Sequence, residues 1–167
     1  MQRLKRMLRH GLSSDRQCRC LFSNDVLTAI EQATKACESR HAGEIRFAVE
    51  TALPFPALWH DVSARMRAIE IFAREHVWDT EHNNGVLIYV LLAEREVENI
   101  ADRGVGNSRV PVSEWEQCCQ IMEAHFRQGA FQAGAIAGIE AVADVLHRYP
   151  PALADAGNEL PDRPILL

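Results

Sequence analysis

An unbroken apolar segment at residues 85–93, GVLIYVLLA, constrains the fold more than any other part of the chain. It holds no charged, amide or imidazole side chain, and it is far too short to cross a bilayer as a helix, which takes about 20 apolar residues. Such a run, opened here by Asn84 and Gly85, is typical of a strand covered on both faces in the middle of a sheet. We therefore predict a central strand over 85–92. The polar residues that crowd both of its ends then need an explanation.

Strands and helices alternate around this segment. Residues 44–50 alternate between polar and apolar with period two, which predicts a strand, and residues 97–102 predict another after the polar turn at 94–96. The order of elements is that of an α/β fold. Apolar residues at helical spacing predict helices over 25–40, from Leu58 to about His76, from Pro111 to Gly129 and from Phe131 to Pro150.

The connections determine which strand ends meet. Residues 51–84 form a long helical connection, so the first two strands should run parallel with a right-handed crossover, whereas the short turn after the central strand allows only an antiparallel hairpin. With the turn centred on Ala93 and Glu94, Gly85 lies opposite Asp102, because residues paired across a hairpin have a constant index sum. The third strand then ends at the edge of the sheet where the first two begin. We expect the polar residues to gather at this edge.

Four oxygen-bearing side chains at the predicted edge are candidate metal ligands, namely Asp79, Glu81, Asn84 and Asp102. Carboxylate and amide oxygens are the ligands that Ca²⁺ and Mg²⁺ prefer, so one of these divalent cations is the predicted cofactor. Such an ion can orient a phosphate and lower the pKa of a bound water. The alternative is structural. In that case Asp79 ends a helix, Asn84 belongs to a turn, and Asp102 pairs with Arg103 or a helix N-terminus.

Three further residues are candidates for the same site. Arg103 precedes Gly104-Val105-Gly106, and a guanidinium beside the backbone N–H groups of a glycine loop can bind an anion. His41 and Glu44 are candidate additional ligands, and His41 is also a candidate general base; otherwise His41 caps the end of the preceding helix. The sequence contains no His-x-x-x-His pair, P-loop or Gly-x-Ser-x-Gly elbow, so it predicts neither a zinc site of that kind nor a nucleotide or serine hydrolase.

Charge is unevenly distributed along the chain. The formal net charge of the 167 residues is −5, yet residues 1–20 hold six Lys or Arg against Asp15 alone. The acidic remainder argues against a nucleic-acid partner, which usually requires a basic face. A helix over residues 1–12 fits either a membrane surface or simple packing on the body with its charges in water. Its apolar residues share one side and are Leu4, Met7, Leu8 and Leu12.

The remaining features indicate a cytoplasmic protein without a transmembrane segment. No apolar signal-peptide core follows the basic start. The five cysteines are odd in number and lack zinc or dithiol spacing, which fits reduced thiols. The predicted organisation is a basic N-terminal extension over 1–23, one α/β domain over 24–149, and a Pro-rich tail over 150–167 that is extended or disordered.

Several of these segments together resemble the TPM domain family. They are Asn-Asn-Gly-Val-Leu-Ile-Tyr-Val at 83–90, the charged hairpin turn, and Ala-Asp-Arg-Gly-Val at 101–105, with support from the strand at 44–50 and from Asp25-x-Leu27-Thr28. The resemblance covers residues 24–149 and implies a three-layer α/β/α sandwich around a short mixed β-sheet. The return strand departs from the family's usual Glu-x-Gly-x-Gly, since Asp102 and Arg103 stand at its end.

For some members the resemblance implies divalent-cation binding and acid phosphatase activity, and for others a role in photosystem repair or membrane-protein assembly. Two hypotheses follow. One is a cation-binding interaction module that supports membrane-protein or envelope assembly, with a protein partner, membrane-associated through the basic N-terminus. The other is a metal-assisted phosphomonoesterase that uses Asp79, Asp102 and Arg103. The sequence contains no evident nucleophile–base pair, and a fold alone confers no activity, so the first hypothesis is favoured.

Overall fold

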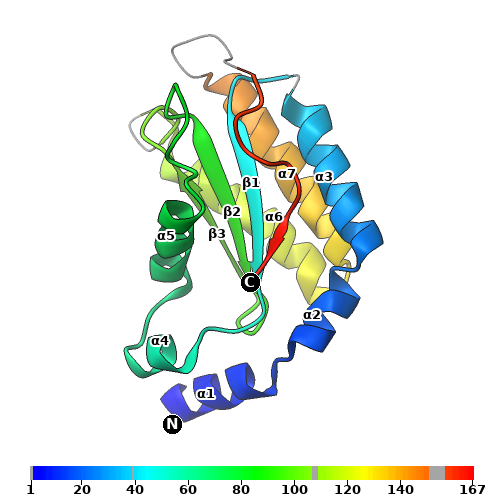
Figure 1. Ribbon diagram of the computed structural model, residues 1–167, viewed down its shortest axis with the longest axis vertical. Helices are drawn as coiled ribbons and strands as arrows, with labels where there is room; N and C mark the ends of the chain where they lie inside the picture. Colours follow the sequence, from blue (N-terminus) through cyan, green and yellow to red (C-terminus); the bar gives the residue numbers. More distant parts are fainter. Residues whose placement is uncertain (1, 39, 107–108, 151–156) are drawn as a thin grey trace.

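The computed structural model describes residues 2–38, 40–106, 109–150 and 157–167. Figure 1 shows a mixed sheet with α5 on one face and α3, α6 and α7 on the other, which confirms the predicted α/β/α sandwich. The helices are α1 (Gln2–Leu12), α2 (Asp15–Leu21), α3 (Asn24–Glu38), α4 (Phe55–Trp59), α5 (Ala64–Arg74), α6 (Val112–Arg127) and α7 (Phe131–Arg148). The strands are β1 (Glu44–Glu50), β2 (Gly85–Leu91), β3 (Glu96–Ala101) and β4 (Ile165–Leu166), in the spatial order β3-β2-β1-β4.

The predicted strand pairings are confirmed. β1 and β2 pair in parallel along their whole length, and β2 pairs with β3 as an antiparallel hairpin. Val86 lies opposite Ala101, and the Asp102 N–H donates to the Gly85 carbonyl oxygen at 2.9 Å. The hairpin register is therefore the one that the constant index sum predicts.

The central strand is buried on both faces, which explains its lack of alternation. Val86, Ile88 and Val90 contribute to the core formed with α3, α6 and α7, whereas the alternate residues contribute to a second core under α5. These alternate residues are Leu87, Tyr89 and Leu91.

A charged group is buried in the core under α5. Glu50 is 4% exposed and accepts a hydrogen bond of 2.6 Å from the Tyr89 hydroxyl and one of 2.8 Å from the Arg67 guanidinium. Burial, together with the bond to Glu50, raises the pKa of Tyr89 far above its usual value, so the phenol stays a neutral donor.

The chain differs from the sequence expectations at three places. The helix predicted from Leu58 to about His76 is divided into α4 and α5, because Asp61 takes a left-handed conformation (φ 56°) and the Ser63 side chain caps a new helix by accepting from the Met66 N–H. The N-terminal extension contains a second helix, α2, which buries Cys18 in the core. The end of the tail, Ile165–Leu166, forms β4 and pairs in parallel with β1, where the sequence predicted no strand.

Candidate functional site

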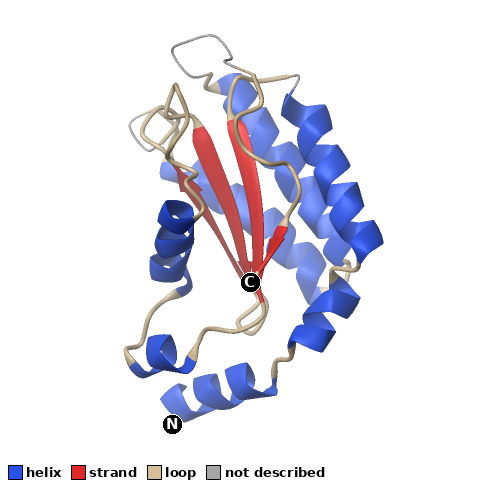
Figure 2. Cartoon of the chain, viewed as in Figure 1, coloured by secondary structure: helices blue, strands red, loops and turns tan. Residues whose placement is uncertain are grey.

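The edge of the sheet where β1 and β2 begin is built from two connected loops. Residues 75–84 lead into β2, and residues 102–106 leave β3 (Figure 2). The Gly104 N–H donates to the Asn83 carbonyl oxygen at 2.8 Å, and a side chain at position 104 would lie 2.5 Å from the carbonyl oxygens of His82 and Asn83. Only glycine allows this approach, so the two loops form one rigid edge.

Asn84 and Asp102 each bring a buried oxygen to this edge. The Asn84 side-chain amide donates to the Ala42 carbonyl oxygen, and one Asp102 carboxylate oxygen accepts from the Arg103 N–H at 2.7 Å. The remaining oxygens, Asn84 Oδ1 and Asp102 Oδ2, are buried without a hydrogen-bond partner among the described residues. Buried polar atoms are nearly always paired, so these two call for a water or a cation.

Asp79 and Glu81 lie in the same loop, but their carboxylates form no hydrogen bond or ion pair with any of the described residues. Both residues are exposed, the Asp79 N–H donates to the His76 carbonyl oxygen at 2.9 Å, and the Glu81 N–H donates to a Glu159 carboxylate oxygen at 2.8 Å. Within the described ranges, no three His, Cys, Asp or Glu side chains converge as a group that could hold a metal ion. The four-ligand site drawn from the sequence therefore stays a prediction.

The guanidinium of Arg103 is exposed and bonds to Asn83 rather than to the Asp102 carboxylate, which accepts only from the Arg103 backbone N–H among the described residues. Its Nε donates to Asn83 Oδ1 at 2.9 Å, and Asn83 is held in a left-handed conformation (φ 52°). The terminal amino groups of Arg103 form no hydrogen bond or ion pair in the part of the chain that the structure describes. This guanidinium is therefore available to an anion.

The side chains of Glu44 and His41 both accept hydrogen bonds from backbone N–H groups. One Glu44 carboxylate oxygen accepts from the Leu160 N–H at 3.1 Å and from the Glu159 N–H at 3.3 Å, and so fastens the tail to β1. His41 Nδ1 accepts from the Gly43 N–H at 3.2 Å. Both residues line a cavity of about 240 Å³ between α3 and the tail.

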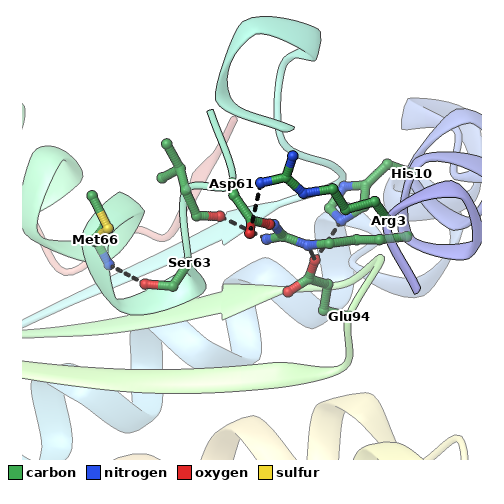
Figure 3. Close-up of polar contacts among 8 residues, drawn as sticks. Arg3, His10, Asp61, Ser63, Met66 and Glu94 are labelled. Atoms are coloured by element: carbon green, nitrogen blue, oxygen red, sulfur yellow. Dashed lines mark hydrogen bonds and ion pairs between the residues drawn. The ribbon is translucent and has the colours of Figure 1, made fainter. Parts of the chain in front are cut away.

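Sequence reasoning missed His82 as a site residue and missed a polar cluster at the opposite end of the sheet. His82 Nδ1 is buried without a partner among the described residues. The position of His82 among the polar residues that precede the central strand was a usable signal. In the second cluster, Glu94 of the β2–β3 turn accepts hydrogen bonds from Arg6 and His10 of α1 (Figure 3). No sequence pattern pairs a turn carboxylate with a helix more than 80 residues away.

Comparison with known proteins identifies the fold independently. The profile of the TPM domain matches residues 19–145. The BA42 protein from the psychrophilic bacterium Bizionia argentinensis is 28% identical, with a TM-score of 0.74 over 87% of this chain and 94% of that chain. The N-terminal domain of a P. gingivalis protein is 24% identical and shares the fold, with a TM-score of 0.59 over 75% of this chain and 76% of that one. No curated protein sequence matches the chain. No helix among the described residues is long and apolar enough to span a bilayer.

Proposed function

This chain belongs to the TPM domain family, and on that premise we propose that it is a divalent-cation-binding interaction module that supports membrane-protein or envelope assembly. Its cation site is the edge where β1 and β2 begin. The proposal separates two properties, cation binding at that edge and partner binding elsewhere, and each has its own support.

One observation carries the cation site. Asn84 Oδ1 and Asp102 Oδ2 are buried oxygens that lack a partner among the described residues, on two loops that Gly104 holds together. An unsatisfied buried oxygen costs about 1–3 kcal/mol, and a bound cation removes that cost. Ca²⁺ and Mg²⁺ accept oxygen ligands of this kind, and Mg²⁺ in particular often binds through one or two carboxylates while keeping several waters.

The scarcity of carboxylates limits the affinity of such a site. Asp102 is the charged ligand with a buried free oxygen, whereas Asp79 and Glu81 lie exposed in the neighbouring loop and enter the coordination only by moving. Few charged ligands correspond to weak calcium sites, with dissociation constants of about 10⁻⁴–10⁻³ M. The exposed carboxylates make the site sensitive to ionic strength.

Exposed apolar side chains on and after α5 support a protein partner. Met66 and Ile69 lie one turn apart on α5 and are 56% and 51% exposed, and Trp78 is 47% exposed. Large apolar side chains that are neighbours on a surface mark interaction sites more often than scattered ones do. Burial of this pair against a membrane protein or envelope component is the proposed assembly contact.

A metal-assisted phosphomonoesterase is the second candidate, and Arg103 favours it. Its terminal amino groups are unpaired among the described residues and stand beside Asp102 in sequence, so the same edge offers a cation ligand and an anion donor. A divalent ion supplies Lewis-acid polarisation of a phosphate when bound. In this chain Arg103 would bind the phosphate and Asp102 would hold the ion.

Calorimetric titration of chelator-stripped protein with Ca²⁺, Mg²⁺ and Zn²⁺ tests the cation site. We expect saturable, weak binding of Ca²⁺ or Mg²⁺ that Asp102→Asn abolishes, because that change keeps the shape and removes the charge. Asp144→Asn on α7 is the matched control, since this carboxylate is 67% exposed and its one ion pair within the described residues is a 3.8 Å contact with Arg40. Binding that survives Asp102→Asn would refute the site.

Hydrolysis of a generic phosphate ester by the cation-loaded protein separates the two candidates. Hydrolysis that Asp102→Asn and Arg103→Gln both abolish would establish the phosphomonoesterase. Cation binding without hydrolysis would leave the interaction module as the function of this edge.

A further inference from the structure

Helix α1 is attached to the body through its polar side. Arg6 donates to the Val62 carbonyl oxygen at 2.6 Å and also to the Glu94 carboxylate, and His10 Nε2 lies 2.7 Å from the same Glu94 oxygen. The Leu53 N–H donates to His10 Nδ1 at 3.0 Å, and His10 is 4% exposed. Figure 3 shows His10 directed toward Glu94 at the end of the hairpin.

The three leucines of α1 consequently face solvent, whereas Met7 is half-buried and lines a cavity with Leu58 and Trp59. Leu4, Leu8 and Leu12 are 64%, 58% and 81% exposed, and we call them the leucine stripe. At about 100° per residue they span about 80° of the helix circumference, centred opposite Arg6 and His10. An amphipathic helix on a globular protein ordinarily buries its apolar stripe, so this helix is docked the other way round.

Unpaired cations border the leucine stripe. Lys5 and Arg9 are exposed and adjoin it on one side, and α2 adds Arg16 and Arg19 close by in sequence. None of these four side chains forms an ion pair within the described residues. The rest of the chain is acidic, so this concentration of positive charge belongs to the N-terminal helices.

We propose that α1 is an interfacial helix whose leucine stripe enters the headgroup region of an anionic lipid bilayer. Leucines on one side with Lys and Arg beside them are the composition of helices that lie in a membrane surface. Lys5 and Arg9 bind lipid phosphates, while Arg6 and His10 keep the helix attached to the domain. Charge complementarity favours lipid over a second copy of this chain, because two copies would bring the same cations together.

The inference does not depend on the cation site. Helix α1 packs through Arg6 and His10 at the end of the sheet where the β2–β3 turn lies, whereas Asn84 and Asp102 lie at the other end. Lipid binding measured in the presence of a chelator therefore fails or succeeds independently of Ca²⁺ or Mg²⁺ binding.

Co-sedimentation of the full chain with vesicles tests the proposal. We expect binding at low salt to vesicles of phosphatidylcholine mixed with phosphatidylglycerol, and little binding to pure phosphatidylcholine. Replacing the three leucines with glutamine should weaken partitioning about 100-fold, because each side chain loses the favourable free energy of partial burial in the interface. Lys5→Gln with Arg9→Gln should weaken it about 30-fold, since each cation near an anionic surface contributes about fivefold.

Met66→Gln with Ile69→Gln is the control, because it removes exposed apolar surface from α5, and the vesicles contain no protein partner for that pair. The leucine variant should fold normally, since its side chains point away from the body, and circular dichroism verifies this. Absence of binding to anionic vesicles, or equal loss in the α5 control, would overturn the proposal. So would a dimer in light scattering that the leucine variant dissociates, because the stripe would then be an interface between copies.

Discussion

Replacing Glu94 with glutamine removes the charge that holds α1 against the sheet. The Glu94 side chain is 8% exposed, and one of its oxygens accepts from both Arg6 and His10. Glutamine keeps the size and the acceptor oxygen of the side chain, so the packing of the β2–β3 turn should not change. The substitution therefore isolates the electrostatic part of the attachment.

The magnitude follows from the two hydrogen bonds. A hydrogen bond to a charged group contributes about 1.5–3 kcal/mol and one between neutral groups about 0.5–1.5 kcal/mol, so each bond weakens by about 1 kcal/mol. Two bonds give a loss of about 2 kcal/mol in the free energy of α1 docking. That corresponds to roughly a thirtyfold rise in the population of undocked helix, while global stability changes less because the core under α3, α6 and α7 is untouched.

Hydrogen exchange of the amides in residues 3–12, measured by mass spectrometry, reads this equilibrium directly. We expect exchange in this segment to accelerate roughly thirtyfold in Glu94→Gln, with no change in β1 or β2. Glu98→Gln is the control, because the Arg65–Glu98 pair is a surface pair with 56% and 26% exposed side chains, which contributes at most about 1 kcal/mol. An acceleration below about threefold would show that Glu94 does not hold α1.

Acid should act on the wild-type protein in the same direction. Burial opposes ionisation of Glu94, but the hydrogen bonds from Arg6 and His10, together with the charge of Arg6, outweigh it, so the pKa of Glu94 lies below its ordinary 4.5. A depressed carboxyl pKa stabilises the docked state fully above pH 4.5, and this stabilisation is lost as the pH falls through the lower folded-state pKa. Exchange in α1, corrected for its intrinsic pH dependence, should accelerate below pH 4.5 in the wild type and much less in Glu94→Gln.

Three further outcomes test the fold. Tyr89→Phe removes one of the two donors to a buried Glu50 oxygen, which keeps its bond from Arg67 Nε, and should lower the free energy of unfolding in urea by about 1.5–3 kcal/mol; no change would refute the pairing. Gly85→Ala places a methyl group 2.0 Å from the Val77 carbonyl oxygen and should cost about 3 kcal/mol or abolish folding, whereas a neutral effect would contradict the close approach. Alkylation near neutral pH, followed by mass spectrometry, should modify exposed Cys20 before any other thiol; burial raises the pKa of Cys118 to about 11 and that of Cys119 to about 12.

The sheet was predictable because two local rules agree on it. The length of the turn after β2 allows only a hairpin, and the apolar run fixes which residues pair, so Gly85 opposite Asp102 followed from the sequence. The gathering of Asn84, Asp102 and Arg103 at one edge followed from that register. The side-chain directions did not, because a register specifies neighbours along the backbone and not which atom each side chain contacts.

Helix periodicity has a similar limit. It grouped Leu4, Met7, Leu8 and Leu12 on one side of α1, but it could not tell that Met7 is half-buried while the three leucines stay exposed. The answer depends on Glu94, whose place in a polar turn indicated solvent exposure. The break between α4 and α5 could have been predicted from the sequence, since Ser63 is a strong N-cap residue inside the apolar pattern.

The orientation of α1 itself indicates that the leucine stripe binds something outside the chain. Turned by half a revolution, the helix would bury three leucines against the body, each worth about 1.5–3 kcal/mol, with its cations in water. The chain instead places Arg6, His10 and Glu94 at a largely desolvated contact, and taking charges out of water costs free energy that their pairing only partly returns. A helix docked for stability alone would favour the first arrangement. The observed arrangement leaves the leucines exposed on a fixed, basic helix. Their burial in a bilayer surface would provide the hydrophobic stabilisation that they do not gain from packing on the body.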